Sequence, residues 1–77
     1  MRILVVDDDS ILIEVLKRSL SSQRHVVEVA EDGQMGWEYV QTGEYELVLL
    51  DVNLPGLDGV SLCEKMRSAG YKTPILL

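Results

Sequence analysis

Aspartates follow two separate apolar segments of this sequence. Residues 3–6 lead directly into Asp7 and Asp8, and residues 47–50 lead into Asp51. A buried strand that ends in a carboxylate places it at the edge of a sheet, where ligands bind in α/β folds. Carboxylates brought together there repel one another unless a cation lies among them, and oxygen-rich sites suit Mg²⁺. An aspartate beside that ion could attack a phosphoryl group, so Asp7, Asp8 and Asp51 are the candidate site.

Strand-end acids can also serve only as helix caps or solvated turn residues. We favour this interpretation for Asp9 and Asp58, which stand just before two predicted helices. A calcium-binding loop starting at Asp51 is excluded because its twelfth position is Leu62 instead of glutamate. No glycine-rich nucleotide-binding motif is present. His25 and Cys63 are expected to be structural.

The composition limits the remaining classes of function. The chain has 77 residues, 47% of them apolar, which predicts one small globular domain. The net charge of −6 argues against direct nucleic-acid binding by this segment. One cysteine allows no internal disulfide and fits a cytoplasmic location, and no apolar run is long enough to span a membrane.

Apolar strands alternate with helical patterns along the chain. Strands are predicted at residues 2–7, 25–30, 46–51 and 73–77, and helices after Asp9 or Ser10, over 34–42 and over 59–68. This βαβαβαβ order predicts an α/β fold with a parallel sheet and helices on both faces.

The first helix has an unusually wide apolar stripe. Its expected sheet-facing residues are Leu12, Val15, Leu16, Ser19 and Leu20. Ile11 and Ile13 widen the stripe beyond one sheet contact. They either face another helix or a second chain, or are partly buried in an ordinary core.

Residues 3–9 and 49–59 together resemble the bacterial response-regulator receiver domain. The turn at residues 31–33 and the segment at 73–75 fit the same pattern. The resemblance covers the chain in the right order. It implies a partial flavodoxin-like fold in one domain, residues 1–77.

The resemblance also implies residue roles. Asp51 would take phosphate from a sensor histidine kinase, with Mg²⁺ as cofactor. Asp8 and Asp51 would bind Mg²⁺ directly, the backbone carbonyl of Asn53 would be a third ligand, and Asp7 would act mostly through water. Such a domain assists its own phosphorylation and is not expected to be an enzyme in its own right.

Pro55 and Gly59 would shape the loop after the acceptor. Family members continue into a fifth strand and two further helices, with a Thr or Ser after strand four and a Lys after strand five. Neither residue falls within these 77. A truncated receiver would leave an open sheet edge and uncovered apolar faces, so we expect a homodimer or complementation by another half-domain.

Two other functions are weighed against phosphate acceptance. The main alternative is a half-domain that self-associates as a structural oligomer without phosphotransfer. An aspartyl-phosphate phosphatase or mutase is disfavoured, because Asn53 stands where such enzymes need an acid two residues beyond the nucleophile.

Overall fold

Four parallel strands form the sheet, in the order β2–β1–β3–β4. The computed structural model describes residues 1–77. In chain order the elements are β1 (Arg2–Val6), α1 (Ser10–Ser22), β2 (Val26–Ala30), α2 (Gly33–Thr42), β3 (Leu47–Leu50), α3 (Gly59–Ser68) and β4 (Ile75–Leu76). The predicted order and the parallel sheet are confirmed. Strand β4 is shorter than the predicted stretch 73–77, because only Ile75 and Leu76 are paired with β3.

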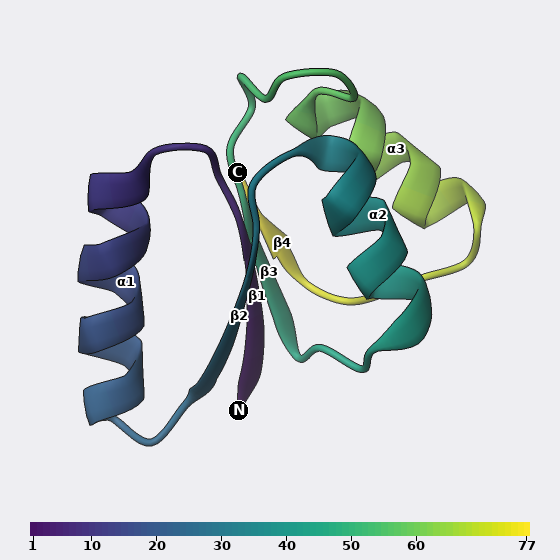
Figure 1. Cartoon of the computed structure of the whole chain (residues 1–77). Coiled ribbons are helices and arrows are strands. Elements are labelled where there is room, and N and C mark those ends of the chain that lie inside the picture. The colour runs from purple at the N-terminus through teal and green to yellow at the C-terminus, as the bar shows by residue number, and fades with distance from the viewer.

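Helices cover both faces of the sheet, as predicted (Figure 1). Helix α1 lies alone on one face, whereas α2 and α3 lie next to each other on the opposite face. Each crossover returns the chain to the same end of the sheet before the next strand begins, so all strands point the same way. No helix has the length and apolar composition needed to cross a membrane.

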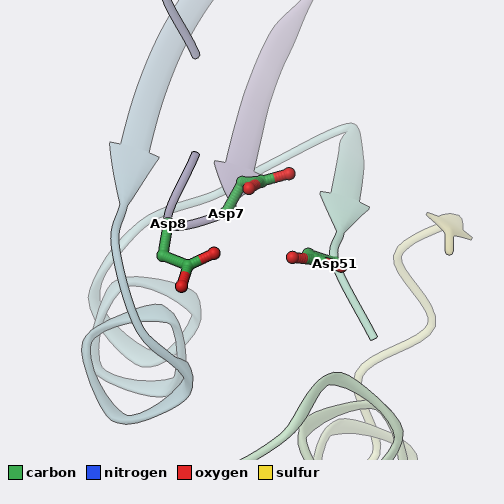
Figure 2. A group of neighbouring side chains, drawn as sticks. All are labelled: Asp7, Asp8 and Asp51. Carbon is green, nitrogen blue, oxygen red and sulfur yellow. The ribbon is translucent and has the colours of Figure 1, made fainter. Parts of the chain in front are cut away.

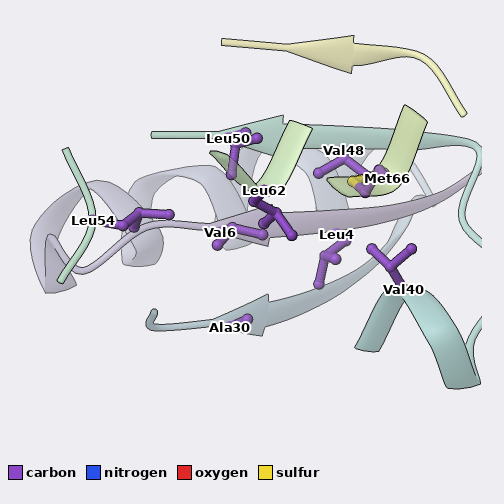
Figure 3. Close-up of a cluster of buried hydrophobic side chains, with 9 residues drawn as sticks. All are labelled: Leu4, Val6, Ala30, Val40, Val48, Leu50, Leu54, Leu62 and Met66. Atoms are coloured by element: carbon purple, nitrogen blue, oxygen red, sulfur yellow. The ribbon is translucent and has the colours of Figure 1, made fainter. Parts of the chain in front are cut away.

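The main hydrophobic core lies between the sheet and the α2–α3 pair (Figure 3). It consists of Leu4, Val6, Ala30, Val40, Val48, Leu50, Leu54, Leu62 and Met66. Continuous apolar strands are buried on both faces in such a fold, and residues 3–6 are all buried here. The tyrosines at 39, 45 and 71 are half-buried and pack against this core, as expected.

Helix α1 covers its face of the sheet only in part, so its apolar face is less buried than an ordinary core helix would be. No residue of α1 is buried. Leu12 and Val15, on the predicted apolar face, are 42% and 53% exposed, and Leu12 lines a groove with residues of the sheet. Ile13 is half-buried, and Ile11 is 76% exposed. Helix α1 packs mainly beside β2, so the part of its stripe directed toward β3 and β4 has no covering element.

Candidate functional site

The strand register brings Asp7 and Asp51 to equivalent positions on neighbouring strands. Val6 of β1 pairs with Leu50 of β3, so the next residue of each strand is an aspartate. The backbone N–H of Asp51 donates to the carbonyl oxygen of Val6 at 2.9 Å, which extends the ladder to Asp51 itself. The convergence predicted from two acid-ended strands therefore follows directly from parallel pairing.

The three predicted carboxylates lie together at this edge of the sheet. Asp7, Asp8 and Asp51 each offer an oxygen, and these oxygens lie within 4.8 Å of one another. Figure 2 shows the side chains of Asp7 and Asp8, at the end of β1, directed toward that of Asp51, after β3. The structure thus confirms that these residues form one acidic group.

The environments of the three acids differ. Asp7 is only 8% exposed, and its Oδ1 accepts a hydrogen bond from the N–H of Asp9 at 2.8 Å. Asp8 is exposed, and Asp51 is half-buried. The Oδ1 of Asp51 accepts from the N–H of Asn53 at 3.2 Å. One carboxylate oxygen each of Asp7 and Asp51 therefore has no protein donor and is available to a ligand.

No side chain of the protein neutralises this group of acids. The two salt bridges in the structure, Arg2 with Glu28 and Arg18 with Glu14, involve none of them. Three carboxylates without a cationic partner are an oxygen-only donor set, which fits a hard divalent cation such as Mg²⁺. The geometry is thus suitable for a metal ion, while the role of each residue as a ligand stays a prediction.

Asn53 is positioned two residues beyond Asp51 on the exposed side of the loop. Its N–H is directed toward Asp51, and no backbone N–H donates to its carbonyl oxygen. That carbonyl accepts no backbone hydrogen bond, and its role as a third ligand stays a prediction.

The aspartates interpreted as helix caps do cap helices. The carboxylate of Asp9 accepts from the amides of Ile11 and Leu12, at 3.0 and 3.2 Å, and is the N-cap of α1. Asp58 caps α3 by accepting from Ser61 at 2.8 Å. The hydrogen bond from the Ser61 amide holds the pKa of Asp58 below its usual value. Both residues therefore stabilise helix N-termini and are not part of the acidic group.

A third cap was not predicted. Asp32 was interpreted only as a turn residue, yet its Oδ1 accepts from the N–H of Met35 at 2.7 Å and caps α2. An aspartate three residues before a helical amide is a usual N-cap signal, and it could have been used.

The loop between β3 and α3 is held in place by its two ends and by its middle. Leu54 is buried in the main core, and Gly59 donates its N–H to the carbonyl oxygen of Val52 at 3.1 Å. A β-carbon at Gly59 would lie 2.1 Å from the backbone oxygen of Asp51. Gly56 has a φ of 72°, a conformation that glycine adopts at no steric cost. The loop-shaping role predicted for Gly59 is therefore supported by close packing against the backbone of Asp51.

Comparison with known proteins decides the family. The sequence model of the response regulator receiver domain matches residues 3–77. The chain belongs to this family. The receiver is 52% identical over 77 residues to Protein RcaC from Microchaete diplosiphon, covering the whole of this chain and 12% of that protein. It therefore spans only a small part of this relative.

Solved receivers share the fold. The structure of the response regulator TrrA from Thermotoga maritima, in complex with Mg²⁺ and BeF, has a TM-score of 0.92 and 34% identity. The match covers 99% of this receiver and 66% of that chain. TrrA in complex with the histidine kinase ThkA has a TM-score of 0.88 at 34% identity, with coverage of 96% and 64%. The fold is that of a receiver through β4.

Proposed function

We propose that this receiver accepts a phosphoryl group on Asp51, with Mg²⁺ held by the neighbouring acids. The observation that carries the proposal is the meeting of three carboxylates without a cationic partner, at the end of paired strands. Membership in the response regulator family makes phosphate acceptance in two-component signalling the function to test first.

Two observations support Asp51 as the phosphoacceptor. Its backbone is fixed to β1 through Val6, and one of its carboxylate oxygens is free of protein donors. In transfer from a phosphohistidine, this oxygen would form the new P–O bond as the P–N bond breaks. The electron pair of that bond would return to the imidazole nitrogen, and the ring would leave as neutral histidine after taking a proton from water. The receiver would then carry an acyl phosphate and would itself be changed, so it acts as the acceptor and not as a turnover enzyme.

The acids around Asp51 would hold Mg²⁺. Asp8, Asp51 and the carbonyl oxygen of Asn53 would bind the ion directly, and Asp7 would bind it through water. Mg²⁺, when bound, supplies positive charge beside the phosphoryl oxygens. The buried carboxylate of Asp7, fixed by the Asp9 amide, would keep its free oxygen directed at the site.

The proposed phosphodonor is a sensor histidine kinase. TrrA, which has the same fold and 34% identity, has been solved in complex with such a kinase. The exposed position of Asp8 and the partial exposure of Asp51 at the edge of the sheet leave the acceptor accessible to a partner.

Intact-mass measurement after incubation with acetyl phosphate and Mg²⁺ tests this proposal. We expect one phosphate adduct that requires Mg²⁺ and is lost in Asp51→Asn. Asp58→Asn is the matched control, because it removes an acid from the same loop while asparagine still caps α3; it should keep the adduct. A folded wild-type protein that forms no adduct would contradict the proposal.

We also propose, as a second function, that the chain self-associates through the face that α1 leaves uncovered. A groove of about 260 Å³ lies between α1 and strands β3 and β4. Its apolar walls are formed by Val5, Leu12, Leu16, Leu49, Leu50, Leu76 and Leu77. Leu76 and Leu77 are more than 60% exposed, and apolar surface of this kind favours burial against another chain.

Sedimentation velocity at several concentrations tests self-association. We expect a dimer that Leu76→Lys converts to monomer. Val60→Lys introduces the same charge at an exposed position of α3, on the other face, and should leave the dimer intact. A wild-type protein that stays monomeric at high micromolar concentration would rule out this second function without affecting the first.

A further inference from the structure

The loop that follows Asp51 contacts α2, a helix that contains none of the three aspartates of the acidic group. Leu57, two residues before α3 begins, lies against Gly33, the first residue of α2. A β-carbon at Gly33 would lie 1.7 Å from the backbone oxygen of Leu57 and 2.7 Å from its carbonyl carbon. No pair of heavy atoms can approach so closely without a bond, so only glycine fits here without a shift of the backbone.

The contact joins two stretches of backbone, which gives it more consequence than a contact between side chains. At Gly36, one turn later in α2, a β-carbon would meet side-chain atoms of Leu62 and Val6 at 3.1 Å. Those atoms can rotate or shift slightly. The carbonyl of Leu57 can move only if the loop moves, because it is part of the main chain.

Neither side of the contact is free to yield easily. Helix α2 begins at Gly33, and its first turn is fixed by the carboxylate of Asp32, which accepts from Met35. On the loop side, Leu54 is buried in the main core and Leu57 packs against it. A side chain at position 33 would therefore push the loop, the N-terminus of α2, or both.

The displaced loop is the one that carries the acceptor and the proposed carbonyl ligand. Asp51 and Asn53 lie at its start, and the bond from Gly59 to the oxygen of Val52 closes it. Metal affinity depends on the groups that fix the ligands in place, and loss of such support weakens binding.

We propose that Gly33 is a positioning residue for the phosphoacceptor site: by letting the carbonyl of Leu57 rest on the N-terminus of α2, it sets the position of the loop that holds Asp51 and Asn53. This inference rests on the proposed function for its consequence, but the contact itself concerns residues outside the acidic group.

Gly33→Ala tests the proposal, with Gly43→Ala as the matched control. Gly43 caps the other end of α2, and a β-carbon there would meet the ring of Tyr45 at 2.9 Å. Both variants thus crowd an end of the same helix, but only Gly33→Ala crowds the loop. Two quantities are measured: the amide chemical shift of Asn53 in metal-free protein, and the dissociation constant for Mg²⁺ by calorimetry.

We expect Gly33→Ala to shift the Asn53 amide and to weaken Mg²⁺ binding about tenfold, the lower end of the losses seen when support behind metal ligands is altered. Gly43→Ala should lower the unfolding midpoint yet keep both quantities at wild-type values. A folded Gly33→Ala protein with an unshifted Asn53 amide and unchanged Mg²⁺ binding would overturn the proposal. If the wild type binds no Mg²⁺, the proposed function fails, and the Asn53 shift alone decides whether Gly33 positions the loop.

Hydrogen exchange on the wild type keeps the proposal falsifiable should Gly33→Ala fail to fold. The amides of Gly59 and Met35 report the loop and the first turn of α2 respectively. Rigid contact through Gly33 predicts that both open with the same free energy as denaturant is added. Opening of the Gly59 amide in a separate, less stable step would overturn the proposal.

Discussion

The α-carbon of Gly59 packs against the backbone of Asp51 so closely that a β-carbon would lie 2.1 Å from the Asp51 carbonyl oxygen. The first residue of α3 is therefore in contact with the proposed acceptor, although eight positions separate them along the chain. This contact fixes where α3 begins relative to the end of β3. It leaves no space for a side chain at position 59.

Gly59→Ala is expected to destabilise the protein by about 1–3 kcal/mol, as overpacking of a closed site does. The same change should reduce Mg²⁺-dependent phosphorylation, because the backbone of Asp51 must move to admit the methyl group. Urea unfolding and intact mass measure the two effects. Ser68→Ala, at the exposed end of the same helix, should change stability by no more than about 0.5 kcal/mol. Equal effects of the two variants would contradict this account.

Asp8→Asn should affect stability in opposite directions without and with Mg²⁺. Without the ion, removal of one negative charge relieves repulsion worth about 1 kcal/mol per pair at such distances in water-like surroundings. The oxygens of Asp8, Asp7 and Asp51 lie within 4.8 Å, so the variant should unfold at higher temperature than the wild type. With Mg²⁺ the wild type should gain stability by ligand binding, and the variant should gain much less.

The midpoint of thermal unfolding is measured without Mg²⁺ and with about 10 mM Mg²⁺, a concentration at which even a weakly bound ion raises the midpoint. Glu14→Gln, which removes an exposed charge of α1 outside the acidic group, is the control and should respond to Mg²⁺ as the wild type does. An Asp8→Asn protein that Mg²⁺ stabilises as much as the wild type would exclude Asp8 as a ligand.

The amino ends of the strands carry a hydrogen-bonded group that should make stability depend on high pH. The hydroxyl of Tyr45 donates to Glu28, which also accepts from Arg2 at 2.5 Å. Burial, with the hydrogen bond to Glu28, raises the pKa of Tyr45 to about 12. The hydrogen bonds from Tyr45 and Arg2 lower the pKa of Glu28.

The folded state holds the Tyr45 proton more tightly than the unfolded state, whose tyrosine titrates near 10.0. The stabilisation is therefore complete below pH 10 and is lost as the pH rises from about 10 toward 12. Tyr45→Phe should cost about 1 kcal/mol at pH 7 through the lost hydrogen bond, and should make the decline above pH 10 shallower. Urea unfolding from pH 7 to above pH 10 measures the loss at pH 7 and the decline at high pH. Tyr71→Phe is the control and should keep the wild-type decline of unfolding free energy above pH 10.

Arg67 holds the connection between α3 and β4. Its two terminal nitrogens donate to the carbonyl oxygens of Tyr71 and Thr73, each at 2.8 Å. Arg67→Ala should reduce the free energy of unfolding by about 1 kcal/mol. Arg67→Lys should lose more than half as much unfolding free energy as Arg67→Ala, because a single ammonium cannot reproduce the two hydrogen bonds of the forked guanidinium. Arg18→Ala removes only an exposed pair with Glu14 and should cost a few tenths of a kcal/mol at most, about the value of such pairs.

Much of the fold and of the acidic group could be predicted from local sequence. Residues 3–6 are continuous apolar positions between Arg2 and Asp7, a pattern typical of a fully buried strand, and they are buried. Asp9 and Asp58 precede helical patterns, and both cap helices. The approach of Asp7 to Asp51 was predictable too, because parallel strands align their carboxyl ends.

Other features depended on which elements meet in space. Leu12 has the spacing of a core residue, yet it is 42% exposed, because burial requires a covering element as well as an apolar side chain. Gly33 stands in an ordinary turn signal, and nothing near it in the sequence indicates that the carbonyl of Leu57 rests on it. The hydrogen bonds from Arg67 to two carbonyl oxygens could likewise not be predicted from the sequence, since an arginine is common in the last turn of any helix.

The sequence by itself thus determined the order of strands and helices along the chain, the helix caps at Asp9 and Asp58, and the two strand ends that carry acid. These depend on periodicity and on hydrogen bonds between near neighbours, which each segment satisfies locally. Only the tertiary structure decided the 4.8 Å grouping of the three carboxylates, the exposed stripe of α1 and the contact of Gly33 with Leu57. These depend on the distance between segments far apart in the chain, which is set by close packing of the whole core.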